Sequence, residues 1–133
     1  MGRHDLAVHL TPDEVSVVRR ALESHADHML AVTHLNPDWD PGKFMRRRTE
    51  LLAIAVKLAR QPSPVMLDVL EAATAHESVV ADLERRQWVM DPSRGYSAAD
   101  RNDATSGMHD LTSAASKLFG AQRSAFVGSW AWS

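Results

Sequence analysis

The chain has 133 residues, which fits one domain, and its lack of cysteine excludes disulfides, thiolate metal sites and a cysteine nucleophile. Its 15 basic and 17 acidic side chains give a net charge of −2, which excludes a global attraction to nucleic acid or anionic lipid. No apolar run approaches the roughly 20 residues that span a bilayer, and the first residues lack the apolar stretch of a signal peptide, so we expect a soluble cytoplasmic protein.

The first predicted elements are a short strand and a capped helix. Residues 5–10 have the period-two pattern of a half-buried strand. Its alternating apolar residues are Leu6, Val8 and Leu10. The next four residues, Thr11-Pro12-Asp13-Glu14, supply an N-cap, a proline in the first turn and a glutamate three positions after the cap, which is a capping box. Apolar residues spaced by three and four follow, so the sequence predicts a helix over residues 11–34.

Prolines divide the middle of the chain into two further helices. The segment Asn36-Pro37-Asp38-Trp39-Asp40-Pro41-Gly42 excludes a continuous helix, and the apolar spacing after it predicts a helix over residues 43–61. Ser63 and Pro64 can cap and open a third helix over residues 64–90, whose broad apolar face could meet two neighbours. Turn-forming residues follow at 91–95 and end that helix.

The sequence predicts a fourth helix over residues 97–119 and leaves its start open. Ser97 could cap it, but residues 100–107 are dense in turn formers, so the helical pattern is clear only from Met108 onward. Gly120 is expected to stop this helix. The predicted fold is therefore an all-α bundle of three long helices and a shorter fourth, with short extended N- and C-terminal segments, in a single domain over residues 1–133.

An aromatic tail is expected over residues 121–133. Three of the eight aromatic residues, Phe126, Trp130 and Trp132, fall in the last eight positions. Exposed tryptophans would form an apolar patch of the kind that soluble monomers avoid, so we expect the tail to pack on its own domain or on another chain. An extended tail could pair with the strand at residues 5–10, and an irregular tail could instead fill gaps between helices.

Histidines are the candidate metal ligands of this chain. His25 and His76 lie inside apolar stripes, and His28 and His109 could join them in a bundle core. The sequence nevertheless has no Glu-x-x-His pair and no His-Glu-x-x-His motif, and a stripe histidine is more often hydrogen-bonded within the core. No metal site or cofactor is therefore expected.

The loop before residue 43 and the basic run after it carry the other candidate sites. Oxygen-bearing side chains alternate at residues 36–40, but Pro41 and Arg47 stand where an EF-hand needs glycine and glutamate, so capping turns explain them better. Four cations then follow at the start of the next helix. They are Lys43, Arg46, Arg47 and Arg48. They could contact phosphate or an acidic partner, and a salt-bridged surface is the simpler interpretation.

We interpret the chain as a non-catalytic helical interaction or regulatory protein that forms homo-oligomers. It has no nucleophile elbow and no glycine-rich phosphate loop, so nothing in the sequence argues for an enzyme. Its 12 arginines against three lysines, with abundant alanine, indicate a bacterial or phage origin. The expected partner is a second copy or another protein, with no membrane. The alternatives are a nucleic-acid-binding regulator using the basic run and a histidine-based metal-binding bundle.

Overall fold

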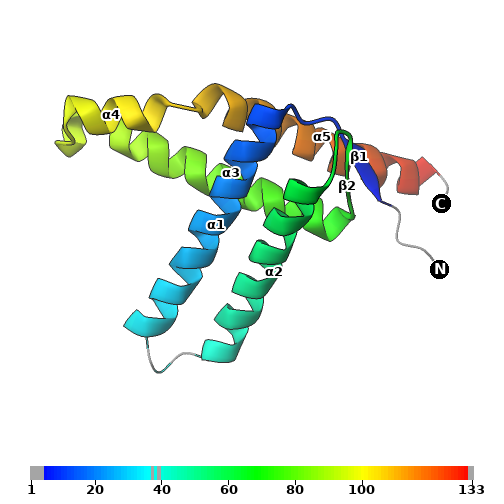
Figure 1. Cartoon of the computed structure of the whole chain (residues 1–133), viewed down its shortest axis with the longest axis horizontal. Coiled ribbons are helices and arrows are strands. Elements are labelled where there is room, and N and C mark those ends of the chain that lie inside the picture. Colours follow the sequence, from blue (N-terminus) through cyan, green and yellow to red (C-terminus); the bar gives the residue numbers. More distant parts are fainter. Residues whose placement is uncertain (1–4, 37, 39, 132–133) are drawn as a thin grey trace.

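The computed structural model describes residues 5–36, 38 and 40–131, with side chains described up to residue 123 (Figure 1). As predicted, the fold is an all-α bundle, to which a very small sheet is added. The elements in chain order are β1 (Leu6–Val8), α1 (Pro12–Leu35), α2 (Pro41–Arg60), β2 (Val65–Leu67), α3 (Val69–Met90), a 3-10 turn (Pro92–Arg94), α4 (Ala98–Thr105) and α5 (Met108–Ala131). No helix within the described part of the chain has the length and apolar character to cross a membrane.

Two helix pairs cross each other to form the core. Figure 1 shows α1 and α2 side by side as a hairpin that crosses the pair formed by α3 and α5. The sheet lies at one end of the α3–α5 pair, and α4 lies at the other end. The side chains at the crossing are almost entirely buried, so this is where apolar burial stabilises the fold. The largest of them are Leu22, Leu51, Leu58, Val79, Leu111 and Leu118.

The predicted start signals of the first two helices are confirmed. The Thr11 side chain accepts a hydrogen bond from the backbone N–H of Glu14 (3.1 Å), and the Thr11 N–H donates to the Glu14 carboxylate (2.8 Å). At the second helix, Asp40 Oδ1 accepts from the N–H of Gly42 (2.9 Å), as expected of a capping turn. Both contacts satisfy N–H groups that a helix start leaves without an intrahelical partner.

A strand forms within residues 5–10, at Leu6–Val8, but its partner is not the C-terminal segment that was one of the two expected alternatives. β1 pairs antiparallel with β2, with Leu6 opposite Leu67 and Val8 opposite Val65. Residues 65–67 therefore form a strand rather than the first turn of a helix that starts at residue 64. The helix begins only at Val69, after a second capping box made by Asp68 and Glu71.

The C-terminal third also departs from the prediction. Two helices, α4 and α5, replace the single helix over residues 97–119, and the chain turns between them at Gly107, whose φ of 78° suits glycine. α5 then continues through Gly120 to Ala131, so Gly120 is not a stop and residues 121–131 are not extended. The reason is packing, because Leu118 is buried in the core and Ala121 packs against it, so the buried stripe of α5 continues past the glycine.

Candidate functional site

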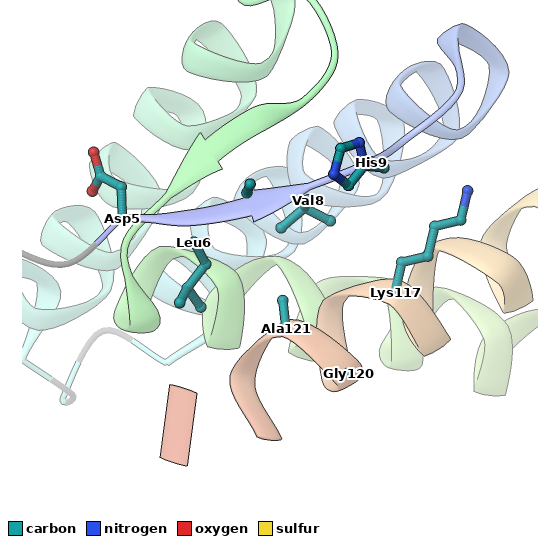
Figure 2. Close-up of a pocket in the computed structure, with 8 residues that line it drawn as sticks. Asp5, Leu6, Val8, His9, Lys117, Gly120 and Ala121 are labelled. Carbon is teal, nitrogen blue, oxygen red and sulfur yellow. The ribbon is translucent and has the colours of Figure 1, made fainter. Parts of the chain in front are cut away.

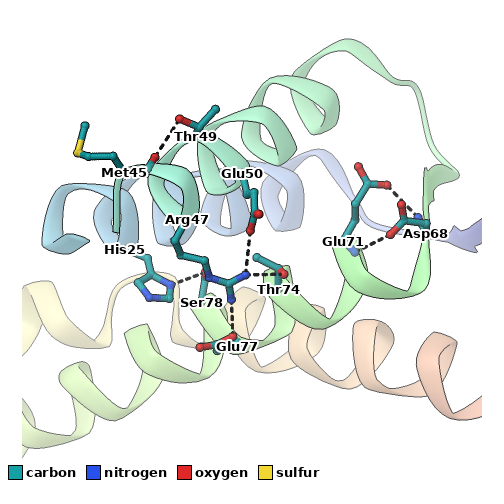
Figure 3. A network of polar contacts seen from close by, with 10 residues as sticks. All are labelled: His25, Met45, Arg47, Thr49, Glu50, Asp68, Glu71, Thr74, Glu77 and Ser78. Carbon is teal, nitrogen blue, oxygen red and sulfur yellow. Dashed lines mark hydrogen bonds and ion pairs between the residues drawn. The ribbon is translucent and has the colours of Figure 1, made fainter. Parts of the chain in front are cut away.

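His25 forms a hydrogen bond that joins α1 to α3. Its Nδ1 lies 2.8 Å from the hydroxyl oxygen of Ser78, which is buried (Figure 3). Burial lowers the pKa of His25, and the nearby charges of Arg47 and His28 lower it further, against an opposing effect of Glu77. A neutral imidazole beside a hydroxyl resembles a base and a nucleophile. Within the described residues, however, no carboxylate hydrogen bonds to the imidazole, so the pair serves as an interhelical contact.

A groove of about 460 Å³ runs beside this contact, between α1 and α3. Its polar lining is mixed in charge, and Ala21 and Met29 form apolar parts of its wall. The polar residues are Ser24, His25, His28, Ser78, Asp82 and Arg85. Two of the predicted histidines therefore share one groove. Asp82 is already engaged by two arginines, as described below, which leaves no free carboxylate on this wall for a metal.

The other two histidines lie elsewhere. His76 packs against Phe119 of α5, with ring centroids 5.8 Å apart, and His109 is exposed in the first turn of α5. No cluster of three or more His, Asp or Glu side chains able to hold a metal ion occurs among the described residues. The structure thus does not bring the four histidines together as a metal-binding bundle requires.

Arg47 of the basic run is built into the contact between α2 and α3. Its guanidinium donates to Glu77 at 2.7 Å, to Thr74 at 3.3 Å and to Glu50 at 3.4 Å (Figure 3). It is two-thirds covered, with 31% of its side chain exposed. Because its donors are directed at these partners, Arg47 is poorly placed to contact a phosphate backbone.

The other cations of the basic run lie in different surroundings. Lys43 and Arg46 line a hollow of about 350 Å³ that also includes Phe44 and Met29. Arg48 is half-buried, and its Nε is buried without a hydrogen-bond partner among the described atoms. The run is therefore divided between packing and solvent, and it does not form one continuous basic surface.

Sequence reasoning missed a buried ion pair between α1 and α5. The Glu14 carboxylate, 2% exposed, accepts a hydrogen bond from Lys117 Nζ at 2.6 Å. Burial alone would raise the pKa of Glu14, but hydrogen bonding to the Lys117 and Ser113 side chains and to the Thr11 N–H lowers it to about 2. The capping box placed Glu14 at a helix start, but no local signal identified a partner 103 positions later.

A second missed contact holds the junction of α4 and α5. Asp82, 7% exposed, accepts hydrogen bonds from Arg85 (2.6 Å) and Arg86 (3.1 Å). Arg86 also donates to the backbone carbonyls of Ala104 (3.1 Å) and Ser106, which lie at the C-terminus of α4. This arginine satisfies carbonyls that the helix end leaves unpaired. Asp82 and Arg86 are four residues apart and so lie on one face of the helix, and this spacing could have predicted their ion pair.

The sheet end of the molecule carries another groove, which we call the sheet-end groove. It has a volume of about 530 Å³ and lies between β1 and α5, lined by residues 5–9 and by Lys117, Gly120 and Ala121 (Figure 2). The predicted aromatic tail continues from this part of α5. Phe126 and Trp130 lie on its helical backbone with side chains outside the described set, and Trp132 lies outside the described residues.

Comparisons with protein-family models, with curated proteins and with solved structures give no match. The function proposed below therefore depends on the geometry of the described residues alone. Within that part of the chain, Glu14, His25, Arg47 and Asp82 are all engaged in contacts that hold the structure together. The features left open to a partner are the sheet-end groove and the apolar side chains exposed on β2, on the first turn of α3 and on α5.

Proposed function

We propose that the protein is a non-catalytic helical interaction protein that self-associates through its sheet end. The observation that carries this proposal is a group of large apolar side chains exposed on β2, on the first turn of α3 and on α5. They are Met66, Val69, Leu70 and Phe119, which are 37%, 46%, 79% and 52% exposed. Exposed apolar surface gathered at one site is typical of a protein interface.

The sheet end differs from the other places where apolar side chains are exposed. Trp88 near the α4 end is covered by the Arg94 guanidinium, which lies 3.3 Å from the ring centroid. Leu35, at the far end of α1, is as exposed as Leu70 but has no groove beside it among the described pockets. Within the described residues, the sheet end combines exposed apolar side chains with a groove and with a sheet of two strands, which is marginal in water.

The two alternative functions receive less support. A nucleic-acid-binding regulator would have to rely on Lys43 and Arg46, since Arg47 is held by Glu77 and Arg48 is partly buried. A metal-binding bundle would need ligands that the described residues do not bring together. A cytoplasmic location is part of the proposal, because a chain without cysteine gains nothing from an oxidising compartment.

The test compares two leucines that are both 79% exposed at different ends of the molecule. Sedimentation velocity over a concentration series gives the mass of the full chain, of Leu70→Ser and of Leu35→Ser. Since burying a leucine contributes about 1.5–3 kcal/mol, we expect Leu70→Ser to weaken self-association at least about tenfold and Leu35→Ser to leave it unchanged. A full chain that stays monomeric, or equal effects of both substitutions, would overturn the proposal.

Removal of residues 125–133 tests the predicted part played by the aromatic tail. If Phe126, Trp130 and Trp132 take part in the interface, the shortened chain should lose mass in the same experiment. An unchanged oligomer would exclude the tail from the interface and leave the other sheet-end residues as its basis.

A further inference from the structure

The two outer edges of the sheet differ in how their backbone groups are bonded. On β2, the Gln61 side chain closes the edge, because its Oε1 accepts from the Met66 N–H (2.9 Å) and its Nε2 donates to the Met66 carbonyl (3.4 Å). A side-chain amide in this position occupies the groups that an added strand would use. Protection of this kind is how proteins prevent edge strands from pairing with other chains.

The bonds of Met66 also fix the direction of the backbone groups of Ala7. Antiparallel strands alternate between residue pairs that exchange hydrogen bonds and pairs whose N–H and C=O groups point outward. Met66 points outward to Gln61 and lies opposite Ala7, so Ala7 also directs its N–H and C=O away from β2. No hydrogen bond reaches these two groups from the described part of the chain.

The open edge of β1 runs along the sheet-end groove. Five consecutive residues, 5–9, line the groove, whereas a strand that presented only one face would contribute alternate residues. In Figure 2, β1 lies between β2 and α5, and its free side borders Lys117, Gly120 and Ala121. Apart from its own helix backbone and chain neighbours, no described atom lies within 4 Å of the place where a Cβ of residue 120 would stand, so this stretch of α5 leaves space beside the strand.

We propose that this edge pairs antiparallel with β1 of a second copy of the chain, about a two-fold axis that passes between the two Ala7 residues. The inference rests on the proposed function and adds the edge of β1 to the proposed interface. Each Ala7 would donate its N–H to the carbonyl of the other, and the two-stranded sheet would become a four-stranded one. The same surface serves both copies, as a two-fold interface requires.

The sequence of the edge is complementary to itself in this register. Pairing about Ala7 places Asp5 of one copy opposite His9 of the other, and the two-fold axis repeats the contact. An imidazole N–H can donate to a carboxylate, and both side chains are exposed. Leu6 and Val8 also lie opposite each other. This pairing of hydrogen-bond donors with acceptors favours a second copy over an unrelated peptide as the occupant.

The main test is Ala7→Pro in the full chain, with Ala7→Val as its matched control. Proline removes an N–H that β2 does not use, so the monomer should fold and show the circular dichroism of the wild type. Loss of both intermolecular hydrogen bonds should raise the dimer Kd at least about tenfold. Ala7→Val keeps the N–H and suits a strand, so it should leave the Kd unchanged.

A charge exchange provides a test that does not alter the backbone. Asp5→Lys places a cation opposite His9 twice in the dimer and should weaken it about tenfold, since cross-strand charge pairs contribute modestly and count twice here. Adding His9→Glu should restore the wild-type Kd. A dimer that persists unchanged in Ala7→Pro and Asp5→Lys would overturn this interface while leaving self-association established. A monomeric wild-type chain would overturn the proposed function itself.

Hydrogen exchange at the Ala7 amide distinguishes the occupants of the edge. Pairing between copies predicts that exchange slows as the protein concentration rises through the Kd. Protection that does not depend on concentration would mean that the edge is covered within one chain, and it would overturn the proposal.

Discussion

The two ends of the molecule each contain a buried carboxylate, but one end is closed and the other is open. At the α4 end, Asp82 is hydrogen-bonded at both oxygens, and its partner Arg86 also satisfies the carbonyls where α4 stops. At the sheet end, the bonds of Glu14 to Thr11 and Lys117 meet at one oxygen, Oε1, and they leave the neighbouring edge of β1 unpaired. The ion pair of Asp82 and Arg86 therefore also satisfies the free backbone groups at the end of α4, whereas the ion pair of Glu14 and Lys117 does not reach those of the β1 edge.

The largest expected effect is at the closed end. Arg86→Met removes the bonds to the α4 carbonyls and leaves buried Asp82 with Arg85 alone, so we expect the free energy of unfolding to fall by about 3 kcal/mol. Arg85→Met is the control, because the Arg85 side chain is 60% exposed and makes one bond to Asp82, and it should cost less than about 1 kcal/mol. Urea denaturation measures both. Equal losses would contradict the assignment of Arg86 to the junction.

An effect of similar size is the pH dependence contributed by Glu14. Its folded pKa of about 2 lies below its ordinary value of 4.5, so the unfolded chain binds the proton more readily between these values. The stabilisation is therefore complete above about pH 4.5 and is lost as the pH falls toward 2, by roughly 3 kcal/mol in all.

Glu14→Gln isolates this contribution. It should destabilise the protein at pH 7 and have little effect near pH 2, where the wild-type carboxylate is itself becoming protonated. Urea unfolding of both proteins at several pH values measures the difference. A difference that stays constant from pH 7 to pH 2 would argue against the ion pair with Lys117.

The smallest effects concern two glycines, Gly107 just before α5 and Gly120 within it. Gly107 has a φ of 78°, and an added Cβ would lie 3.4 Å from Val17, so Gly107→Ala should lower stability by about 1 kcal/mol. Gly120 lies within the helix with open space around it, so Gly120→Ala should raise stability by about 0.5–1 kcal/mol. Thermal unfolding at low protein concentration should give opposite signs for the two variants. The same sign for both would contradict the described course of α5.

Much of the local structure could be predicted because its causes lie within a few residues. The capping box at Thr11 and Glu14 and the turn at Asp40 depend on side chains that bond to nearby backbone, and both are confirmed. The error at residues 64–68 has a related cause. In the sequence, Pro64 and Asp68 are both suitable start signals for the third helix. Only the pairing with β1 makes residues 65–67 a strand, so that the helix begins after Asp68.

The candidate sites were harder to predict because they depend on which helix faces meet. His25 and His76 both lie in apolar stripes of the sequence. In the structure, His25 forms a hydrogen bond with Ser78 between α1 and α3, whereas His76 packs on Phe119 of α5. The sequence could not show that Arg47, rather than Arg46 or Arg48, forms the contact between α2 and α3, because that contact depends on the position of Glu77 on α3.

The sequence by itself determined that the chain is a helical bundle, where α1 begins and that a strand lies near residue 6, since capping, periodicity and proline act over short distances. It placed the start of α2 at residue 43, two residues after the observed start at Pro41. The tertiary structure alone decided the partner of that strand, the course of α5 through Gly120 and the pairing of Glu14 with Lys117. These features join segments far apart in the chain, and their stability comes from burial and charge pairing that exist only after the helices have packed.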